Sequence, residues 1–364
     1  MGLIRTRLAS DADRPALIEF IRDHWSARHV FVADPAVFDW QYRQADGRIN
    51  MMLAERLEDD ASANILGVLG FIPMGRFDPA LGDRDIMLAL WKVRDDIAPP
   101  GLGLRLLKAI QAQLQPRIIG AIGISEMVGP IYRALGYQLD HLCQAAVMNP
   151  MAQDRLRLAQ GVPADAFATA APPAQFALRD LDPARDAGLV AALAARGSLQ
   201  KSWDYLRERY LDHPWYDYDL RLVMQGDRPE AVVIWRAVEA QGARILRIVD
   251  VIGGTDWLGE AAALLRPELV AAGAEYIDIM ACGLDEDMLR AGGLVSPDWC
   301  PGLILPNYFA PYEPRNIRIA LAWKNFGPET ADKAPMRLFR ADSDQDRPNQ
   351  PMPRRTAAPI PQES

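Results

Sequence analysis

The sequence predicts an α/β protein made of two similar units, each of which combines strands with helices. The chain of 364 residues is longer than one typical domain of roughly 100 to 200 residues. Its 50% hydrophobic and 24% charged residues are the proportions of an ordinary globular protein. The order of strand and helix patterns in the first half also recurs in the second, although the residues hardly repeat. This recurrence indicates the duplication of one unit.

In the first half, apolar runs bounded by turn residues predict the strands, and apolar residues at a spacing near 3.6 predict the helices. Strands are expected at residues 3–8, 64–71, 85–93 and 118–125. Helices are expected up to residue 21, after the cap-like Ser10, at residues 101–115 and at residues 130–135.

The second half repeats this order. Strands are expected at residues 176–181, 231–238, 243–252 and 276–281, and helices at residues 182–196 and 257–272. The predicted division is a first domain at 1–150, a linker rich in Ala, Pro and Gln at 151–174, a second domain at 175–329 and a polar tail at 330–364. The tail is charged and rich in proline, so it is expected to lack a core of its own.

Composition excludes several classes of function. The net charge is −8 and no basic stripe contains interleaved aromatic residues, so nucleic acid is not an expected partner. Cys143, Cys282 and Cys300 are far apart and form no C-x-x-C pair, which argues against a disulfide framework and against a metal site. No apolar stretch reaches 18 residues, so no membrane insertion is expected. These features favour a cytoplasmic protein.

The strongest local signal is a glycine-containing turn between a strand and an amphipathic helix. Gly101 and Gly103 stand at the start of a helix whose apolar residues are Leu102, Leu106, Ile110 and Leu114. Free amides and the positive end of the helix dipole at such a position bind anions, and glycine lets a phosphate approach the backbone. The turn predicts a phosphate site formed by Gly101, Leu102, Gly103 and Leu104, although a plain tight turn would give the same pattern.

Together with a second motif, this turn resembles the GCN5-related N-acetyltransferase (GNAT) superfamily. The family motif [Q/R]-x-x-G-x-[G/A] corresponds to residues 98–103, where Ala98 replaces the glutamine or arginine. The family motif Y-x-x-x-G-[FY] corresponds to Tyr132, Gly136 and Tyr137 in IYRALGY. The resemblance implies two tandem GNAT-like domains, each with a mixed, mostly antiparallel, twisted sheet flanked by helices.

The resemblance also implies site residues and a cosubstrate. Acetyl-CoA or another acyl-CoA is the expected donor, held at the glycine turn. In the family a tyrosine protonates the departing thiolate, which makes Tyr132 the expected general acid. A backbone amide of the preceding strand polarises the thioester carbonyl, and Val93 or Arg94 is the expected donor. A tyrosine packed on its helix remains the alternative reading of Tyr132.

Other segments resemble a subgroup of these acyltransferases that is encoded in surface-polysaccharide and sugar-modification clusters. They include residues 27–42, 67–73 and 90–93, and in the second half residues 203–218, 306–316 and 342–349. The resemblance implies a small amine acceptor, with a nucleotide-linked amino sugar as the preferred candidate. His29 lies among polar and aromatic residues and is a candidate base for the acceptor amine, unless this region only packs its aromatic residues.

The sequence thus predicts an acyl-CoA-dependent N-acyltransferase of surface-glycan biosynthesis. The second half is expected to be a degenerate copy without a second CoA site, because Gly253 and Gly254 do not fit the motif. The segment DSDQDRPN at residues 342–349 lacks the glycine and distal glutamate of a calcium loop and is interpreted as a docking segment. The alternatives are a non-catalytic binding protein, favoured by Ala98, and an aminoacyl or peptidyl transferase of the same doubled fold, which the acidic charge disfavours.

Overall fold

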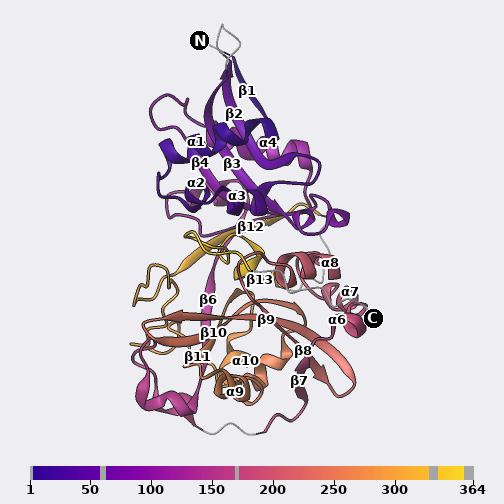
Figure 1. The fold of residues 1–364 in the computed structure, drawn as a ribbon, viewed down its shortest axis with the longest axis vertical. Coiled ribbons are helices and arrows are strands. Elements are labelled where there is room, and N and C mark those ends of the chain that lie inside the picture. Colours follow the sequence, from indigo (N-terminus) through magenta and orange to yellow (C-terminus); the bar gives the residue numbers. More distant parts are fainter. Residues whose placement is uncertain (1–2, 58–62, 169–171, 328–334, 356–364) are drawn as a thin grey trace.

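The protein is described by a computed structural model that covers residues 3–57, 63–168, 172–327 and 335–355. Figure 1 shows two halves stacked along the long axis, with the N-terminal half in indigo at the top and the C-terminal half in orange below. The last part of the chain, in yellow, crosses between them. The segment of residues 338–350, here named the crossing segment, therefore lies between the halves.

The first half follows the predicted order of elements and contains strands that the sequence did not suggest. Its elements are β1 (Ile4–Ser10), α1 (Arg14–His24), α2 (Val30–Ala33), α3 (Pro35–Tyr42), β2 (Arg48–Leu57), β3 (Ala63–Pro73), β4 (Asp85–Val93), α4 (Leu102–Leu114), β5 (Ile118–Ile122), α5 (Gly129–Ala134) and β6 (Gln138–Met148). The strands β2 and β6 were not predicted.

The second half repeats the pattern with shorter helices. Its elements are β7 (Phe176–Asp180), α6 (Pro183–Asp186), α7 (Leu189–Ala194), α8 (Trp203–Leu206), β8 (Asp219–Gln225), β9 (Arg228–Ala240), β10 (Ala243–Gly253), α9 (Ala261–Ala272), β11 (Tyr276–Cys282), α10 (Glu286–Ala291), β12 (Ile319–Asn325) and β13 (Leu338–Phe339). The helix expected over residues 182–196 is broken into α6 and α7.

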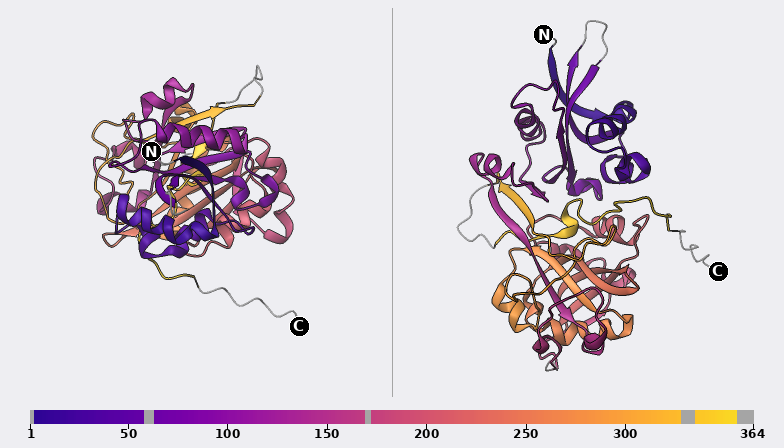
Figure 2. Two further views of the ribbon diagram at one scale, coloured as in Figure 1. Left: turned by 90° about the horizontal axis from the view of Figure 1, so that it is seen from above. Right: turned by 90° about the vertical axis from the view of Figure 1, so that its left-hand side faces the viewer.

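The strands of the described residues form one 13-stranded sheet, in the order β1-β2-β3-β4-β5-β12-β6-β11-β10-β9-β8-β7, with β13 paired to β11 off this path. The strand β6 joins the halves, because residues 138–142 pair with β12 and residues 143–148 pair with β11. The right-hand view of Figure 2 shows β6 running from the waist into the lower half. Within the described residues, only β4–β5 and β10–β11 pair in parallel. The predicted class, a mixed and mostly antiparallel sheet flanked by helices, is confirmed.

Helices cover the sheet on both faces because their apolar residues lie on one side. In α4, Leu102, Leu106, Leu107 and Ile110 are buried against strands β2 to β5. The helices α1 to α3 contribute to a different core cluster that continues into the second half. The two halves therefore share buried apolar contacts. Among the described residues, none of the helices combines the length and the apolar character that crossing a bilayer requires.

The predicted boundaries do not coincide with the sheet. Residues 319–325, which were assigned to the second domain, form the strand β12 between β5 and β6 of the first, where residues 321–325 pair with β5. In the expected linker, Leu158 is buried. In the expected tail, Leu338 and Asp346 are fully buried, because their partners come from distant parts of the chain. Residues 330–334 and 356–364 of that tail lie outside the described residues.

Candidate active site

A cavity of about 390 Å³ lies where β4 and β5 separate. The two strands pair in parallel only from Asp85 to Leu88 and from Ile118 to Ala121, and beyond these residues they diverge. This opening, here named the strand cavity, is lined by Trp25, His29, Leu88, Ala89, Leu90, Trp91, Ala121, Ile122, Gly123, Ile124, Ser125, Val128, Tyr132, Asp344, Gln345 and Arg347. It contains both residues that the sequence predicted to be catalytic.

A bulge in β4 shapes one wall of the cavity. Leu90 has a φ of 59°, which is unusual for a non-glycine residue, and the pairing of β3 with β4 shifts register at this point. The hydroxyl of Tyr42 lies 3.4 Å from the carbonyl oxygen of Ala89. On β3, a Cβ on Gly70 would lie 2.5 Å from the same oxygen, so only glycine fits there. The bulge is therefore supported by Tyr42 and by the close approach of β3 at Gly70.

The bulge decides which amides of β4 face the opening. Arg94 donates its amide to the carbonyl of Leu66 on β3, at 2.9 Å. Because successive amides of a strand point to opposite sides, the amides of Trp91 and Val93 are directed away from β3. Of the two donors that the sequence proposed, Arg94 is thus already bonded within the sheet. The amide of Val93 points away from β3, as a donor to the thioester carbonyl must.

The start of α4 presents backbone donors beside this wall. Gly101 has a φ of 79°, and Leu102 donates to the carbonyl of Pro99 at 3.3 Å. Among the described residues, the amides of Gly103 and Leu104 have no hydrogen-bond partner. They lie in the first turn of a 13-residue helix, where the dipole favours an anion. The geometry suits a phosphate group, as the glycine turn predicted.

Two neighbours of this turn were not recognised from the sequence. A Cβ on Gly103 would lie 3.1 Å from Nε1 of Trp91, so any larger residue here would have to displace the indole ring. The guanidinium of Arg56 on β2 donates to the carbonyl of Ile97 at 3.1 Å. Ile97 adjoins Ala98, the position where a basic or amide residue is missing. A cation from another strand therefore stands close to this gap in the motif.

Tyr132 projects from α5 into the strand cavity and is 2% exposed. Its ring lies edge to face with Trp91 and Tyr137, with centroids 6.0 Å and 5.0 Å away. Burial, together with the nearby Tyr137, raises the pKa of the Tyr132 hydroxyl above its ordinary value. The hydroxyl is therefore protonated at neutral pH, which is the state required of a proton donor.

His29 lies on the opposite wall, at the N-cap of α2. Burial and the positive charge of Arg347 lower the pKa of His29 to about 4, so the ring is neutral at physiological pH. Its Nδ1 accepts the amide of Phe31 at 3.2 Å. This bond places the ring proton on Nε2, where the ring can donate a hydrogen bond but cannot accept a proton. The structure thus favours a donor role for His29 over the predicted base.

The crossing segment closes the cavity and supplies charged groups that sequence reasoning missed. Asp344 and Arg347 line the cavity and lie 3.6 Å apart, and Arg347 also stacks on Phe31 at 4.7 Å from its centroid. A Cβ on Gly123 of the loop after β5 would lie 2.9 Å from Nε2 of Gln345. Among the described residues of the wall, Asp344 is the one carboxylate. In the sequence, only the alternating charges of this segment hinted at these cavity residues.

The corresponding position in the second half is filled. The parallel pair β10–β11 ends at Ile248 and Ile279, and β13 then pairs with Ala281 and Cys282 of β11. At the counterpart of the glycine turn, a Cβ on Gly254 would collide with the carboxylate of Glu230, which forms a 2.6 Å ion pair with Arg196. Strand β13 thus occupies the strand opening in this half, and the Glu230 and Arg196 side chains occupy the turn.

His213, in the segment of residues 203–218, is a packing residue. It is 1% exposed, and its Nδ1 accepts the amides of Trp215 and Tyr216 at 3.1 Å and 2.9 Å. Its ring lies 4.6 Å from the ring of Trp40 in the first half. Burial, followed by nearby cations, lowers the pKa of His213 to about 2. It therefore joins the halves as a neutral side chain.

Comparison with known proteins supports the fold assignment. No family model matches the sequence. No curated protein matches it either. Among solved structures, a GCN5-related N-acetyltransferase from Anabaena variabilis is similar, with a TM-score of 0.54 and 13% identity over 89% of this chain and 73% of that one. A putative acetyltransferase from Pyrococcus horikoshii is also similar, with a TM-score of 0.48, 10% identity and coverage of 91% and 92%. The chain has the fold of the GCN5-related N-acetyltransferases.

Proposed function

We propose that the protein is an acyl-CoA-dependent N-acyltransferase, with acetyl-CoA as the preferred donor and the strand cavity as its active site. One observation carries the proposal. A separated pair of parallel strands and a buried tyrosine line one cavity, and the start of a helix with free amides adjoins its wall at Trp91. Each part suits a different portion of an acyl-CoA.

The residues present fit the donor. The amides of Gly103 and Leu104, with the guanidinium of Arg56 nearby, would hold the pyrophosphate. The amide of Val93, directed away from β3, would donate a hydrogen bond to the arm of the acyl-CoA that leads to the thioester. An acyl-CoA supplies an activated carbonyl for transfer to an amine. The filled counterpart in the second half supports one donor site per chain.

Two side chains are suited to the proton transfers. The hydroxyl of Tyr132 would protonate the thiolate that leaves when the acceptor amine attacks the carbonyl carbon. Asp344, which is 15% exposed at its side chain, would attract the acceptor ammonium and take its proton. His29 would orient the acceptor through its Nε2 proton. The acid and the base would thus come from α5 and from the crossing segment.

The acceptor is proposed to be a small amine, with a nucleotide-linked amino sugar of surface-glycan biosynthesis as the candidate that the sequence resemblance favours. The first test is titration of the full chain with acetyl-CoA by calorimetry. Binding with a stoichiometry of one is expected, and no binding at millimolar acetyl-CoA would contradict the proposal. Release of free thiol in the presence of a panel of amino sugars then separates an enzyme from a binding protein.

A further inference from the structure

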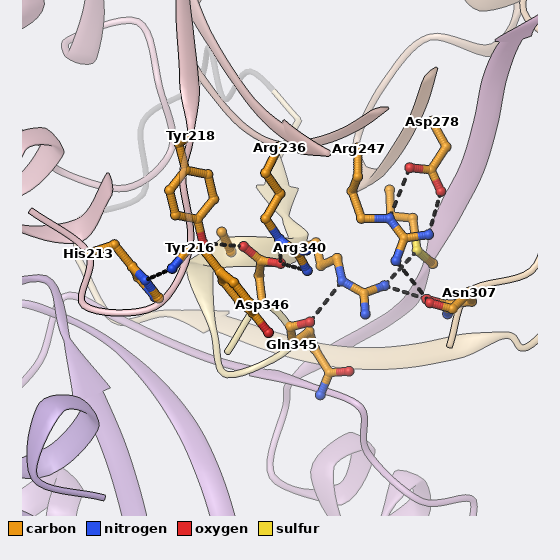
Figure 3. Close-up of polar contacts among 12 residues, drawn as sticks. His213, Tyr216, Tyr218, Arg236, Arg247, Asp278, Asn307, Arg340, Gln345 and Asp346 are labelled. Atoms are coloured by element: carbon orange, nitrogen blue, oxygen red, sulfur yellow. Dashed lines mark hydrogen bonds and ion pairs between the residues drawn. The ribbon is translucent and has the colours of Figure 1, made fainter. Parts of the chain in front are cut away.

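A second cavity, of about 420 Å³, lies on the other side of the crossing segment. Figure 3 shows part of its wall, where the side chains of Arg236, Arg247 and Arg340 lie in a row. Arg347 also lines it. We propose that this cavity, here named the arginine cavity, binds an anionic oxygen group of the acyl acceptor, a carboxylate or a phosphate, through Arg340. That the bound molecule is the acyl acceptor rests on the proposed function, whereas the anion site itself does not.

Two of these arginines are already neutralised by buried carboxylates. Arg236 donates from Nε and Nη2 to Asp346 at 2.9 Å and 2.8 Å, and Asp346 also accepts the hydroxyl of Tyr218 at 2.7 Å. Arg247 forms a two-point ion pair with Asp278, at 2.9 Å and 2.6 Å. These pairs leave no net charge. Both carboxylates are fully buried. The two ion pairs therefore hold the wall of the cavity in place.

Arg340 differs because it has only neutral partners among the described residues. Its Nε donates to the carbonyl of Gln345 at 2.8 Å, and its Nη1 donates to the side-chain oxygen of Asn307 and lies 3.1 Å from the sulfur of Met280. The residue is 5% exposed. A buried charge without a counter-ion is costly. The guanidinium of Arg340 therefore provides one positive charge that an anion can neutralise.

Burial and the neighbouring Arg247 lower the pKa of Arg340 to about 10, which still leaves the guanidinium charged at neutral pH. Another carboxylate of the wall, Glu239, is paired with Arg244 at 2.5 Å and has a side chain 66% exposed. It therefore does not neutralise Arg340. The Arg347 charge is offset by Asp344, 3.6 Å away. The surplus of charge thus belongs to Arg340.

Beside the unneutralised charge of Arg340, Asn307 adds a hydrogen-bond donor without a partner among the described residues. Its side-chain oxygen must face Arg340, because a guanidinium can only donate. Its Nδ2 is then left without a hydrogen-bond partner among the described residues, although the side chain is 1% exposed. A neutral buried donor without a partner is rare and requires an explanation. An anionic oxygen between Arg340 and Asn307 would satisfy both groups.

The position of the arginine cavity links it to the proposed reaction. Asp344, Gln345 and Arg347 line both cavities, so the crossing segment forms a common wall. An acceptor that places its amine at Asp344 can therefore direct an anionic group toward Arg340. This arrangement selects an acceptor that carries both an amine and an anion, and it disfavours a simple neutral amine.

The test uses the full chain and two probes, inorganic phosphate and acetate, against chloride at equal ionic strength. A rise in Tm with either anion is expected, and the larger response identifies phosphate or carboxylate as the preferred group. Arg340→Gln should weaken this binding at least tenfold. Arg228→Gln, at an exposed position on β9, should leave it unchanged.

A second variant keeps the test decisive if Arg340→Gln fails to fold. Asn307→Asp places a carboxylate beside Arg340, so it should raise Tm in chloride and lower the response to both anions by as much as Arg340→Gln does. Equal Tm values in phosphate, acetate and chloride for the wild type, or responses that are the same in the wild type, Arg340→Gln and Asn307→Asp, would overturn the inference. Anion binding without acetyl-CoA binding would instead contradict only the proposed function, because neither variant touches the glycine turn.

Discussion

The indole ring of Trp91 lies edge to face with the ring of Tyr132, with centroids 6.0 Å apart. The same indole meets Gly103 at the start of α4. One side chain of β4 therefore contacts both the proposed phosphate turn and the proposed acid. A change at the turn is expected to reach the reacting end of the cavity through this ring.

Gly103→Val should weaken acetyl-CoA binding, because its Cβ would displace Trp91 from a distance of 3.1 Å. We expect the Kd to rise at least tenfold, which corresponds to about 1.4 kcal/mol. Calorimetry measures this directly. Gly188→Val is the matched control, because a Cβ at Gly188 meets no atom within 4 Å. Equal affinity of wild type and Gly103→Val would place the donor elsewhere.

Tyr132→Phe should lower kcat by about 100-fold and leave the Kd for acetyl-CoA nearly unchanged, since it removes the proton donor but keeps the ring. Steady-state thiol release measures the effect. Tyr137→Phe is the control, because that hydroxyl accepts a hydrogen bond from Gln111 at 3.1 Å outside the cavity wall. Similar rates in all three proteins would leave Tyr132 with a packing role.

Asp344→Asn should lower kcat/KM for the acceptor by about 100-fold, because the amide can neither attract an ammonium nor take its proton. Donor affinity, measured by calorimetry, should not change. The exposed Asp95→Asn provides a control for loss of one negative charge. A variant that loses donor affinity in parallel with activity would show that Asp344 supports the structure of the cavity instead.

Saturating titration should give one acetyl-CoA per chain, because Glu230, Arg196 and β13 fill the corresponding space in the second half. The stoichiometry of a calorimetric isotherm, at a protein concentration fixed by amino-acid analysis, decides the matter. Two equivalents in the wild type, of which one keeps its affinity in Gly103→Val, would mean that the second half also binds the donor.

The pH dependence of stability should contain a contribution from Asp342. Lys201 lies 2.6 Å from Asp342 and from Asp250, and Tyr210 donates to Asp250 at 2.6 Å. Burial, with the nearby Asp250 charge and against the attraction of Lys201, raises the pKa of Asp342 to about 6. Its ordinary value is 3.8. Because the folded value is higher, this stabilisation is present below about pH 4 and is lost as the pH rises through 6.

Asp342→Asn removes this titration. The free energy of unfolding of the variant, relative to that of the wild type, should therefore increase from pH 4 to pH 7, by up to about 1.4 kcal/mol for each unit of the shift. Urea unfolding across this range measures the difference. A difference between variant and wild type that does not change with pH would contradict the raised pKa.

Local patterns predicted the parts of the site that local sequence builds. The glycine turn and Tyr132 were found because each lies in a short motif on one helix. The strand β13 has only two residues, which is too short to show the alternating hydrophobic pattern of a strand. The charges of the crossing segment looked like those of a solvated tail, yet Asp342 pairs with Lys201 and Asp346 with Arg236. Such partners lie more than 100 residues away, so no local pattern reports them.

The predicted class of fold was right because strand and helix periods are local, whereas the strand order was not predictable in the same way. The sequence Ile319–Asn325 was not recognised as a strand, and nothing near it indicates insertion between β5 and β6. Similarly, the base role of His29 depended on which ring nitrogen is free. That question was decided by the amide of Phe31, through the turn that starts α2.

The insertion of β12 has a consequence for synthesis of the chain. When residue 150 has left the ribosome, β5 and β6 each still lack the neighbour that β12 later provides. Unpaired strand edges invite pairing with other chains, and the missing strand follows nearly 170 residues after β6. At about 5 to 20 residues per second, the nascent first half waits some ten to thirty seconds for its last strand. The N-terminal half therefore cannot complete its sheet before the C-terminal half has been made, and the two halves mature as one unit.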